Sequence, residues 1–336
     1  MAGSKISNTA DPNAPATDHS IASVLTQIPH AASDRAEGGA EFDLRLVNPI
    51  TRYCVVRGVP QLGYRIAVEA LIRGEAENRS RAHCDALFAG GQIAAHLGRY
   101  PEARSYLEQS LAMAREIDDS ARVVASLTLL GSVSLGQGDL AAAQVRLEEA
   151  VADARNKNIQ RQISSALSTL AELHHTRREL DTAERLYLEA LAHFRTQGDA
   201  DSIAVTLCNL AMVWIESDDT HRAQSGALEA LDIVEAIGSK HTGHTVLEVL
   251  TGLAASRASW EAAAMFFGAA ARLAEESGLE PSPPDMAFLD SMVPRVYAAI
   301  GAPTFAVAEQ AGRALGYEEA IALSRSWLVS EAAARE

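Results

Sequence analysis

The chain has 336 residues, of which 48% are hydrophobic and only 5% aromatic, and it carries a net charge of −15. Its length and apolar content suit one or two compact domains or one long repeat array, and the shortage of aromatic residues favours packed Ala- and Leu-rich helices over a β-sandwich. Such an acidic surface repels phosphate backbones, which excludes nucleic acid as a partner for the bulk of the chain.

The N-terminal region, residues 1–40, is rich in Ala, Ser, Asn, Asp, Pro and Gly. A segment of this composition buries too little apolar surface to offset the entropy lost on folding, so we expect a disordered tail. Within it, residues 21–28 have a sequence that favours a short helix.

The next region, residues 41–79, carries a weakened copy of a pattern that the rest of the chain repeats every 40 residues. Gly58, for example, precedes Gly98 by 40 positions. We therefore expect a degenerate first repeat, as is common at the end of a repeat array where one face meets water. Pro49 is expected to delay or kink the first helix of this repeat, because proline lacks the N–H group of the helical ladder.

Five clear repeats occupy residues 80–279. The spacing of 40 residues is visible in a column of alanines: Ala103, Ala143, Ala183, Ala223 and Ala263. A column of leucines keeps the same register: Leu87, Leu127, Leu167, Leu207 and Leu247. A register this strict over five copies indicates an internally repeated structure.

Each repeat is predicted to be a pair of helices. In one copy the first helix carries Leu127, Leu130 and Val133 on a single stripe, and Gly138-Asp139 separates it from the second helix. The alanine columns allow two helix axes to approach closely. No pair can bury its apolar stripe alone, so the pairs are expected to stack into one continuous core.

Residues 280–336 fall outside the repeat register. Three prolines in residues 280–284 predict an extended connector, and Gly301 and Gly316 mark later breaks. The predicted helices of this section span about residues 286–299, 303–313 and 317–332. We expect them to cap the stack.

The small residues of the repeat resemble those of the tetratricopeptide repeat. Leu130-Gly131, Gly138-Asp139, Ala143 and Ala150 stand where that motif has its Leu-Gly pair, its turn and its two alanines. The common unit has ~34 residues, and the longer unit of this chain implies longer helices. Units of this length are similar to the superhelical sensor regions of bacterial transcriptional activators related to the maltose-regulon activator.

The C-terminal section, from Trp260 to Ala320, resembles the C-terminal end of LuxR-type regulators and related predicted ATPases. Together these resemblances imply an all-α fold, a right-handed α-solenoid of antiparallel helix pairs with a 40-residue period and a C-terminal helical cap. Regulators of this kind usually carry a Gly-rich phosphate loop, and the sequence contains no G-x-x-x-x-G-K-[ST] motif. No DNA-reading helix-turn-helix is visible after the solenoid.

The resemblance also implies a partner-binding groove, because the first helices of tetratricopeptide pairs line the concave face. The groove positions transferred from it are Asp85, Phe88, Gln92, His96, Thr128, Ser132, Ser168, Glu172, His175, Cys208, Asn209 and Met212. The family's carboxylate-clamping pattern of Lys, Asn and Arg is missing, since only Asn209 matches it. An acidic C-terminal peptide is therefore disfavoured as the ligand.

Two histidine pairs are the candidates for a metal site, and neither has the spacing of metal ligands. His174 and His175 are neighbours on one helix and point about 100° apart. His241 and His244 have no Cys or carboxylate at a matching interval. We therefore predict no metal site, and we interpret these histidines as core, groove or surface residues.

No catalytic cluster is visible either. His83-Cys84 is a bare dipeptide without a nucleophile–base arrangement, so we predict that the protein is not an enzyme and has no cofactor. Trp260, Phe266 and Phe267 form either a partner anchor or a packing layer beneath the capping helices. Their position just before the Pro-rich connector favours packing.

Three cysteines, Cys54, Cys84 and Cys208, are too few and too irregular for a disulfide framework and are interpreted as buried thiols in a reducing compartment. No charged segment followed by an apolar run marks a signal peptide. No apolar run approaches the ~20 residues that cross a membrane. We expect a cytoplasmic, bacterial protein with no membrane partner.

Two functions are consistent with these features. The first is a non-catalytic protein–protein interaction scaffold with a regulatory role, whose partner is a protein or a peptide. The second is an effector- or peptide-sensing module of a bacterial transcriptional regulator that lacks its ATPase and DNA-binding domains, in which a small effector shifts the superhelix. Self-association through the open ends of a solenoid stays open as well.

Overall fold

The computed structural model of the protein describes residues 39–74, 80–277 and 282–333. These residues form fourteen α-helices and no β-strand. The predicted disordered tail and the predicted short helix at residues 21–28 lie outside the described residues, apart from the last two positions of the tail, which begin the first described helix. Residues 280 and 281 of the expected Pro-rich connector also lie outside them, and the prediction of an extended segment is wrong for Pro283 and Pro284, which begin a helix because proline fits its first turn.

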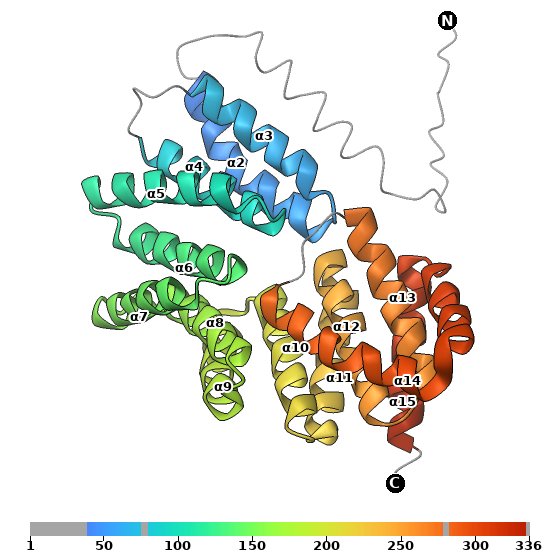
Figure 1. Cartoon of the computed structure of the whole chain (residues 1–336). Coiled ribbons are helices and arrows are strands. Elements are labelled where there is room, and N and C mark those ends of the chain that lie inside the picture. The colour runs from blue at the N-terminus through green and yellow to red at the C-terminus, as the bar shows by residue number, and fades with distance from the viewer. Residues whose placement is uncertain (1–38, 75–79, 278–281, 334–336) are drawn as a thin grey trace, which may run out of the picture.

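Twelve of the helices form six antiparallel pairs that stack side by side into a right-handed superhelix (Figure 1). The first helices of the pairs are α2 (Gly39–Val56), α4 (Arg81–His96), α6 (Ser120–Gly136), α8 (Gln160–Thr176), α10 (Ala200–Glu216) and α12 (Lys240–Ser256). The second helices are α3 (Pro60–Arg73), α5 (Tyr100–Glu116), α7 (Leu140–Asn156), α9 (Leu180–Gln197), α11 (Thr220–Ile237) and α13 (Trp260–Ser277). The predicted all-α solenoid is therefore confirmed.

The helices end at a backbone position that recurs every 20 residues. A left-handed residue with positive φ occurs there throughout the described repeats: Gly58, Gly98, Asp118, Gly138, Asn158, Arg178, Gly198, Asp218, Gly238 and Ala258. Glycine adopts this conformation freely, and Asp or Asn tolerates it, whereas it costs Arg178 and Ala258 about 1 kcal/mol each. The next helix often begins with an aspartate cap, as where Asp119 Oδ1 accepts from Arg122 N–H at 3.1 Å.

The alanine columns lie where helices cross. All five alanines identified from the spacing are 0% exposed: Ala103, Ala143, Ala183, Ala223 and Ala263. Gly131 faces the second helix of its own pair, and a β-carbon there would lie 2.6 Å from the Leu147 side chain. Small residues at these positions allow the close helix contacts that the spacing predicts.

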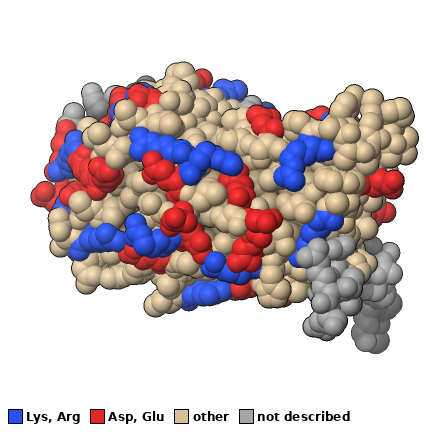
Figure 2. All heavy atoms as spheres, turned by 60° about the horizontal axis from the view of Figure 1, so that its bottom comes forward, with Lys and Arg blue, Asp and Glu red and all other residues tan. Residues whose placement is uncertain are grey.

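Ion pairs on the surface repeat with the same register. Arginines near the ends of α5, α7 and α9 each pair with a glutamate 34 residues later: Arg115–Glu149 at 3.5 Å, Arg155–Glu189 at 2.5 Å and Arg195–Glu229 at 2.7 Å. Figure 2 shows basic and acidic side chains intermingled on the face that it presents. Exposed pairs of this kind each contribute only ~0.2–1 kcal/mol, so they fine-tune the stack rather than hold it together.

The first pair differs from the expectation in one respect. Pro49 lies inside α2, which begins at Gly39 and continues past the proline, so the predicted late start of this helix is wrong. Gly63 takes the place of the marker alanine and is buried against the preceding and following helices, where a β-carbon would lie 2.5 Å from Ile93 Cδ1.

The C-terminal helices do more than cover the end of the stack. Helix α14 (Pro283–Arg313) begins with a capping box formed by Ser282 and Asp285, and Gly301 interrupts its helical geometry with φ 74° and ψ 162°. Its first half turns back into the superhelix and contacts α8 and α12, while α15 (Tyr317–Ala333) packs on α11, α12 and α13 (Figure 1). The expected cap is thus present, and it also enters the concave face.

The two ends of the superhelix meet. Helix α2 contacts α12, Arg52 of α2 faces Asp199 at 3.6 Å, and the rings of His96 and His241 lie edge to face at 5.6 Å. The stack therefore makes almost one closed turn around its concave face. None of the described helices combines the length and the hydropathy that a bilayer crossing requires.

Candidate functional site

The concave face holds a cavity of about 550 Å³ that all six first helices line. Four of the twelve predicted groove residues lie in its wall: Phe88, Gln92, His96 and Thr128. This volume falls within the ~300–1,000 Å³ typical of ligand pockets. The cavity is therefore the candidate binding site.

Two other predicted groove residues lie beside the cavity rather than in its wall. Asp85 binds Arg122 at 2.5 Å, and the Arg122 guanidinium lies over the Phe88 ring at 4.0 Å from its centre. Ser132 lies one turn further along α6 and is half-buried. Asp85 thus holds an arginine in the cavity wall instead of facing a ligand directly.

The remaining six predicted groove residues lie deeper in the stack, on α8 and α10. Cys208 and Met212 are 0% exposed, and Asn209 and His175 are also buried. The His175 ring meets the buried Glu216 carboxylate at 2.9 Å. Ser168 and Glu172 are half-buried. None of these six lines the cavity.

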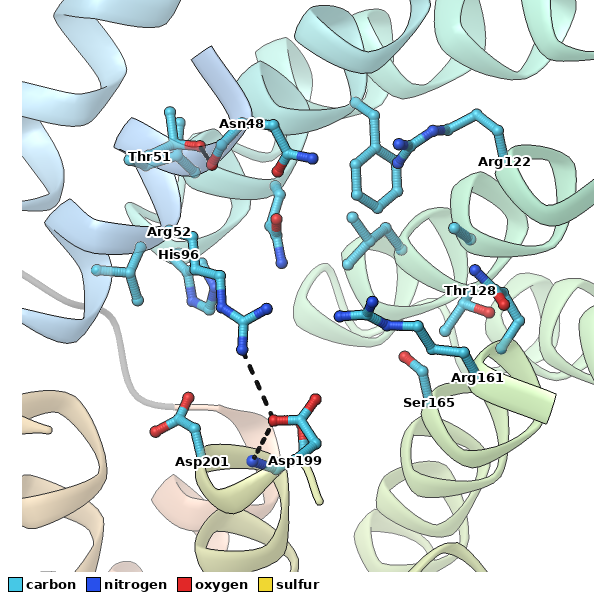
Figure 3. Close-up of a pocket in the computed structure, with 18 of the residues that line it drawn as sticks. Asn48, Thr51, Arg52, His96, Arg122, Thr128, Arg161, Ser165, Asp199 and Asp201 are labelled. Carbon is cyan, nitrogen blue, oxygen red and sulfur yellow. Dashed lines mark hydrogen bonds and ion pairs between the residues drawn. The ribbon is translucent and has the colours of Figure 1, made fainter. Parts of the chain in front are cut away.

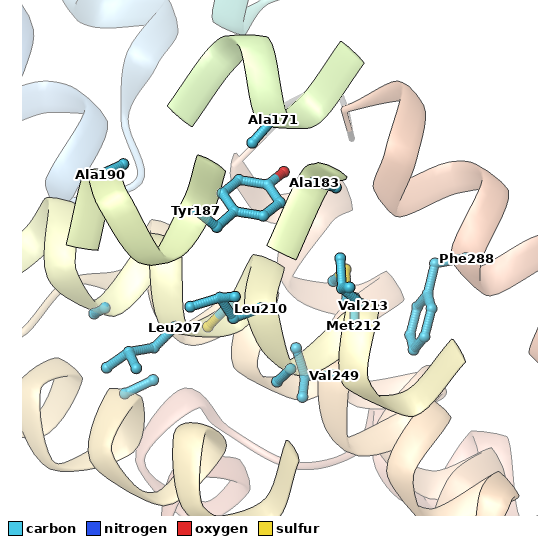
Figure 4. Close-up of a cluster of buried hydrophobic side chains, with 14 of the residues drawn as sticks. Ala171, Ala183, Tyr187, Ala190, Leu207, Leu210, Met212, Val213, Val249 and Phe288 are labelled. Atoms are coloured by element: carbon cyan, nitrogen blue, oxygen red, sulfur yellow. The ribbon is translucent and has the colours of Figure 1, made fainter. Parts of the chain in front are cut away.

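Helix α14 fills the part of the concave face in front of these residues of α8 and α10. Phe288 is fully buried and lies against Gly252 of α12 so closely that a β-carbon on the glycine would lie 2.0 Å from the ring. Figure 4 shows Phe288 beside Met212 and Val213 of α10, with which it shares one buried cluster. This part of the groove is occupied by the protein itself.

Carboxyl groups gather around the inserted helix. Burial, with Asp285 of α14 nearby, raises the pKa of Glu172 to about 8, and the same causes raise the pKa of Glu248 well above its usual value. Burial also raises the pKa of Asp285. Burial lowers the pKa of His244, whose ring lies 3.6 Å from the Glu248 carboxyl group, to about 4. With a pKa of about 8, Glu172 is mostly protonated at pH 7, which keeps one negative charge out of a poorly solvated region.

The cavity itself is rich in arginine, which the sequence analysis did not single out. Arg81 is paired with Asp119 at 2.5 Å, and Arg122 with Asp85 as described above. Arg52 faces Asp199 at the longer distance of 3.6 Å. The Arg161 side chain is exposed in the cavity and has no partner in the described part of the chain; Figure 3 shows it pointing from α8 into the space that Arg52 also faces.

A signal for this site was present in the repeat register. One column at the start of the first helices contains Arg81, Ala121, Arg161, Asp201 and His241, and all five residues line the cavity. Four of its five members are charged or polar, whereas the alanine and leucine columns are apolar throughout. Sorting the repeat columns by polarity would have found the site from the sequence.

Two histidines close the cavity where the ends of the superhelix meet. Burial lowers the pKa of His96 to about 4, with His241 nearby adding to the effect. Burial also lowers the pKa of His241, against the opposing influence of Asp201. Both rings are therefore neutral at pH 7, which lets them pack against each other.

The histidines and the buried Cys84, which are the sequence's candidates for metal binding and catalysis, have the following surroundings. In the described ranges no three His, Cys, Asp or Glu side chains are grouped so that they could hold a metal ion. His174 contacts Glu179 at 2.5 Å. Cys84 lies buried with its Sγ 3.3 Å from the Ser110 carbonyl oxygen, and burial raises the pKa of this thiol, which disfavours the nucleophilic thiolate.

The aromatic residues near the C-terminal cap pack inside the protein. Phe266 is 1% exposed and meets Trp327 of α15 edge to face at 5.5 Å, and Phe267 meets Phe305 of α14 at 6.1 Å. The cluster therefore joins the repeat stack to the cap, in line with the interpretation that the sequence favours.

Comparison with known proteins identifies this architecture. The family model described as the MalT-like TPR region matches residues 85–295. No curated protein matches the chain by sequence.

Solved structures share the fold at low sequence identity. A Rap protein complexed with Competence and Sporulation Factor is 13% identical, with a TM-score of 0.62 over 92% of this chain and 81% of that chain. The Rap conjugation gene regulator of plasmid pLS20, in complex with the Phr* peptide, is 11% identical, with a TM-score of 0.57 over 80% of each chain. A signal transduction ATPase with a tetratricopeptide repeat sensor, from Pyrococcus horikoshii, is 14% identical, with a TM-score of 0.54 over 92% of this chain and 53% of that chain.

Proposed function

Because the chain belongs to the family of MalT-like TPR regions, we propose that it is a non-catalytic regulatory module that binds a protein or peptide partner in the cavity of its concave face. The observation that carries this proposal is the cavity of about 550 Å³, whose wall combines the apolar Phe88 and Ile93 with unpaired polar groups such as Arg161. Apolar side chains that bury a ligand and polar groups that fix its orientation are the two components of ligand pockets, and this wall has both, with polar residues in the majority. One structure of the same fold, the pLS20 regulator, contains a bound peptide.

The experiment blocks the cavity and asks whether peptide binding is lost. Peptides selected from a random display library against the full chain are titrated against Ser165→Trp, which places a bulky ring in the cavity from an exposed position on α8. The matched control is Val145→Trp, at a position on α7 that is 66% exposed and outside the cavity. We expect the first substitution to abolish binding and the second to preserve it. Equal binding by both variants would contradict the proposal.

A second function, sensing of an effector, is favoured by the way the superhelix closes. The cavity is lined by Arg52 on α2 of the first pair and by His241 on α12 of the last, so an occupant can contact both ends of the stack. An occupant that binds one arrangement of these ends better than another shifts the equilibrium between them. Fluorophores on α2 and α10 test this function, since sensing requires their transfer efficiency to change on ligand binding whereas a rigid scaffold requires it to stay constant.

The other expectations stay predictions. They are a cytoplasmic location, the absence of nucleic-acid and membrane partners, and self-association through the ends of the stack. The meeting of α2 with α12 and the packing of α15 leave less free surface at the ends than an open solenoid would have.

A further inference from the structure

The arginines of the cavity differ in how well their charge is balanced. Arg81 and Arg122 each have a carboxylate at 2.5 Å. Arg161 has none among the described residues, and Arg52, with a side chain that is 59% exposed, has only the longer contact to Asp199. Asp199 also caps its helix by accepting from Ser202 N–H. Arg52 and Arg161 thus face one space, and only Arg52 has a carboxylate partner among the described residues (Figure 3).

Primary amides surround the same space. The side chains of Asn48, Gln92 and Gln162 line the cavity and make no hydrogen bond within the described residues. Each primary amide offers both a donor and an acceptor, as a peptide group does. The cavity therefore presents to a ligand the pairing groups that the backbone of an extended peptide needs.

The arginine pair lies between two hollows rather than at the end of one. A second cavity of about 630 Å³ shares Arg52, Arg161, Asp199 and Asp201 with the first. A bound segment can therefore continue on both sides of the two arginines. This arrangement suits an acidic side chain in the middle of a segment better than the carboxylate of a chain end.

The overall negative charge of the protein does not oppose such a ligand at short range. At physiological ionic strength, charges more than ~8 Å apart are largely screened, so the net charge of −15 acts weakly inside the cavity. Asp199 faces Arg52, and Asp201 accepts from the Thr242 hydroxyl at 2.9 Å, which fixes the orientation of its carboxylate and leaves its charge in place. Arg161 is the cation without a carboxylate partner among the described residues, and it provides the preference for an anion.

We propose that the cavity binds an extended peptide segment through an internal Glu or Asp side chain, which contacts Arg161 and draws Arg52 away from Asp199. This inference rests on the proposed function and adds the ligand's chemical class. Because Arg52 belongs to α2 and Arg161 to α8, the carboxylate bridges two sides of the superhelix. A guanidinium binds a carboxylate in a bidentate geometry, which fixes the register of the segment.

The test uses two pools of synthetic heptapeptides, acetylated at the N-terminus and amidated at the C-terminus, with random residues around a fixed centre. The centre is Glu in one pool and Gln in the other. Binding of the fluorescently labelled full chain is measured on arrays, and the best pairs are titrated in solution. We expect each Glu peptide to bind about tenfold tighter than its Gln counterpart, the range for a charge-assisted hydrogen bond.

The variants assign this preference to one residue. Arg161→Gln is expected to make the Glu and Gln peptides bind alike, because it removes the unpaired cation and keeps hydrogen-bonding capacity. The matched control is Arg185→Gln on α9, an exposed arginine that is also without a partner in the described part of the chain and lies outside both cavities. It removes the same charge and should leave the tenfold preference intact.

Other outcomes separate the two proposals. If peptides bind in the cavity but Glu and Gln peptides bind alike to the unmodified protein, the ligand class is wrong and the proposed function stands. If binding requires a free C-terminal carboxylate in place of the central Glu, the internal side chain is the wrong source. If no peptide from either pool binds and none is selected from the display library, both proposals fall together.

Discussion

The two halves of the concave face are built from the same kind of helix but have opposite contents. The open half is hollow, is lined by all six first helices and contains arginines of α2, α4, α6 and α8, two of them incompletely paired. The filled half, next to α8 and α12, is occupied by α14, and its carboxyl groups have raised pKa values. The repeat register therefore determines only how the helix pairs stack. The polar columns and the non-repeated helix α14 determine which part of the concave face stays open.

In the filled half, the largest loss of stability is expected on substitution of Phe288, the aromatic residue at its centre. Phe288→Ala is expected to lower the free energy of unfolding by ~3–5 kcal/mol, because it empties a fully buried site next to Gly252. Urea unfolding measures the loss. The control is Met286→Ala on the same helix, where the side chain is 44% exposed and the expected change is within about 0.5 kcal/mol. Similar small losses in both variants would mean that α14 does not depend on this contact.

The raised pKa values predict a pH dependence that belongs to the filled half. Folded Glu172 keeps its proton up to about pH 8, whereas the unfolded chain releases it near its ordinary pKa of ~4.3. The folded state therefore loses stability as pH rises between these values. Asp285 and Glu248, whose pKa values are also raised, act in the same direction.

Glu172→Gln sharpens this prediction because glutamine resembles the protonated acid. Between pH 5.5 and 8 the unmodified protein should lose ~3 kcal/mol of stability relative to the variant. Parallel urea titrations at the two pH values measure the difference. Identical pH profiles for the two proteins would show that Glu172 is ionised in the folded state, against the assignment of a raised pKa.

In the open half, Arg122 is expected to contribute more to the free energy of unfolding than the other arginines of the cavity. Arg122 is largely buried, lies over the Phe88 ring and binds Asp85, so Arg122→Ala should cost ~1–2 kcal/mol. Arg81→Ala is the control, since its side chain is 72% exposed and its ion pair contributes below ~1 kcal/mol. Thermal unfolding of both variants ranks them, and the reverse order would contradict the packing role of Arg122.

The smallest expected change in stability follows substitution of Arg161, the residue proposed to contact the ligand. Arg161→Ala should change the free energy of unfolding by no more than ~0.5 kcal/mol, because the side chain is exposed and has no partner in the described ranges. Its effect should appear in binding alone. A loss above ~1 kcal/mol in urea unfolding would indicate that Arg161 stabilises the fold and is not held free for a ligand.

The repeats could be predicted from the sequence because buried helix crossings and helix ends each require particular residue types, which recur at a fixed spacing. The column that includes Ala143 and Ala183 records helix crossings, and glycines such as Gly138 record left-handed helix ends. The path of α14 could not be predicted, since a helix outside the period carries no register to show where it returns. Gly252, which receives Phe288, was a faint sign, because a glycine in a buried helix often marks a close neighbour.

The candidate site was predicted in part, and the reason lies in the choice of columns. Of the groove positions that the tetratricopeptide resemblance implies, Phe88, Gln92, His96 and Thr128 lie in the cavity wall. The resemblance also selected residues such as Met212 that α14 covers, because it describes an open groove. The arginines escaped notice because no motif marks them: Arg52 lies in the degenerate first repeat, and Arg161 shares its column with residues of other kinds.

The meeting of α2 with α12 also changes how the stack is expected to come apart. In an open repeat array each unit touches only its neighbours, so the ends fray first and the array can unfold unit by unit. Here α2 of the first pair also contacts α12 and, through Arg52, Asp199, while His96 of the second pair packs on His241 of the last. Losing the first pair therefore breaks contacts on two sides at once, which links the ends of the array into one cooperative unit.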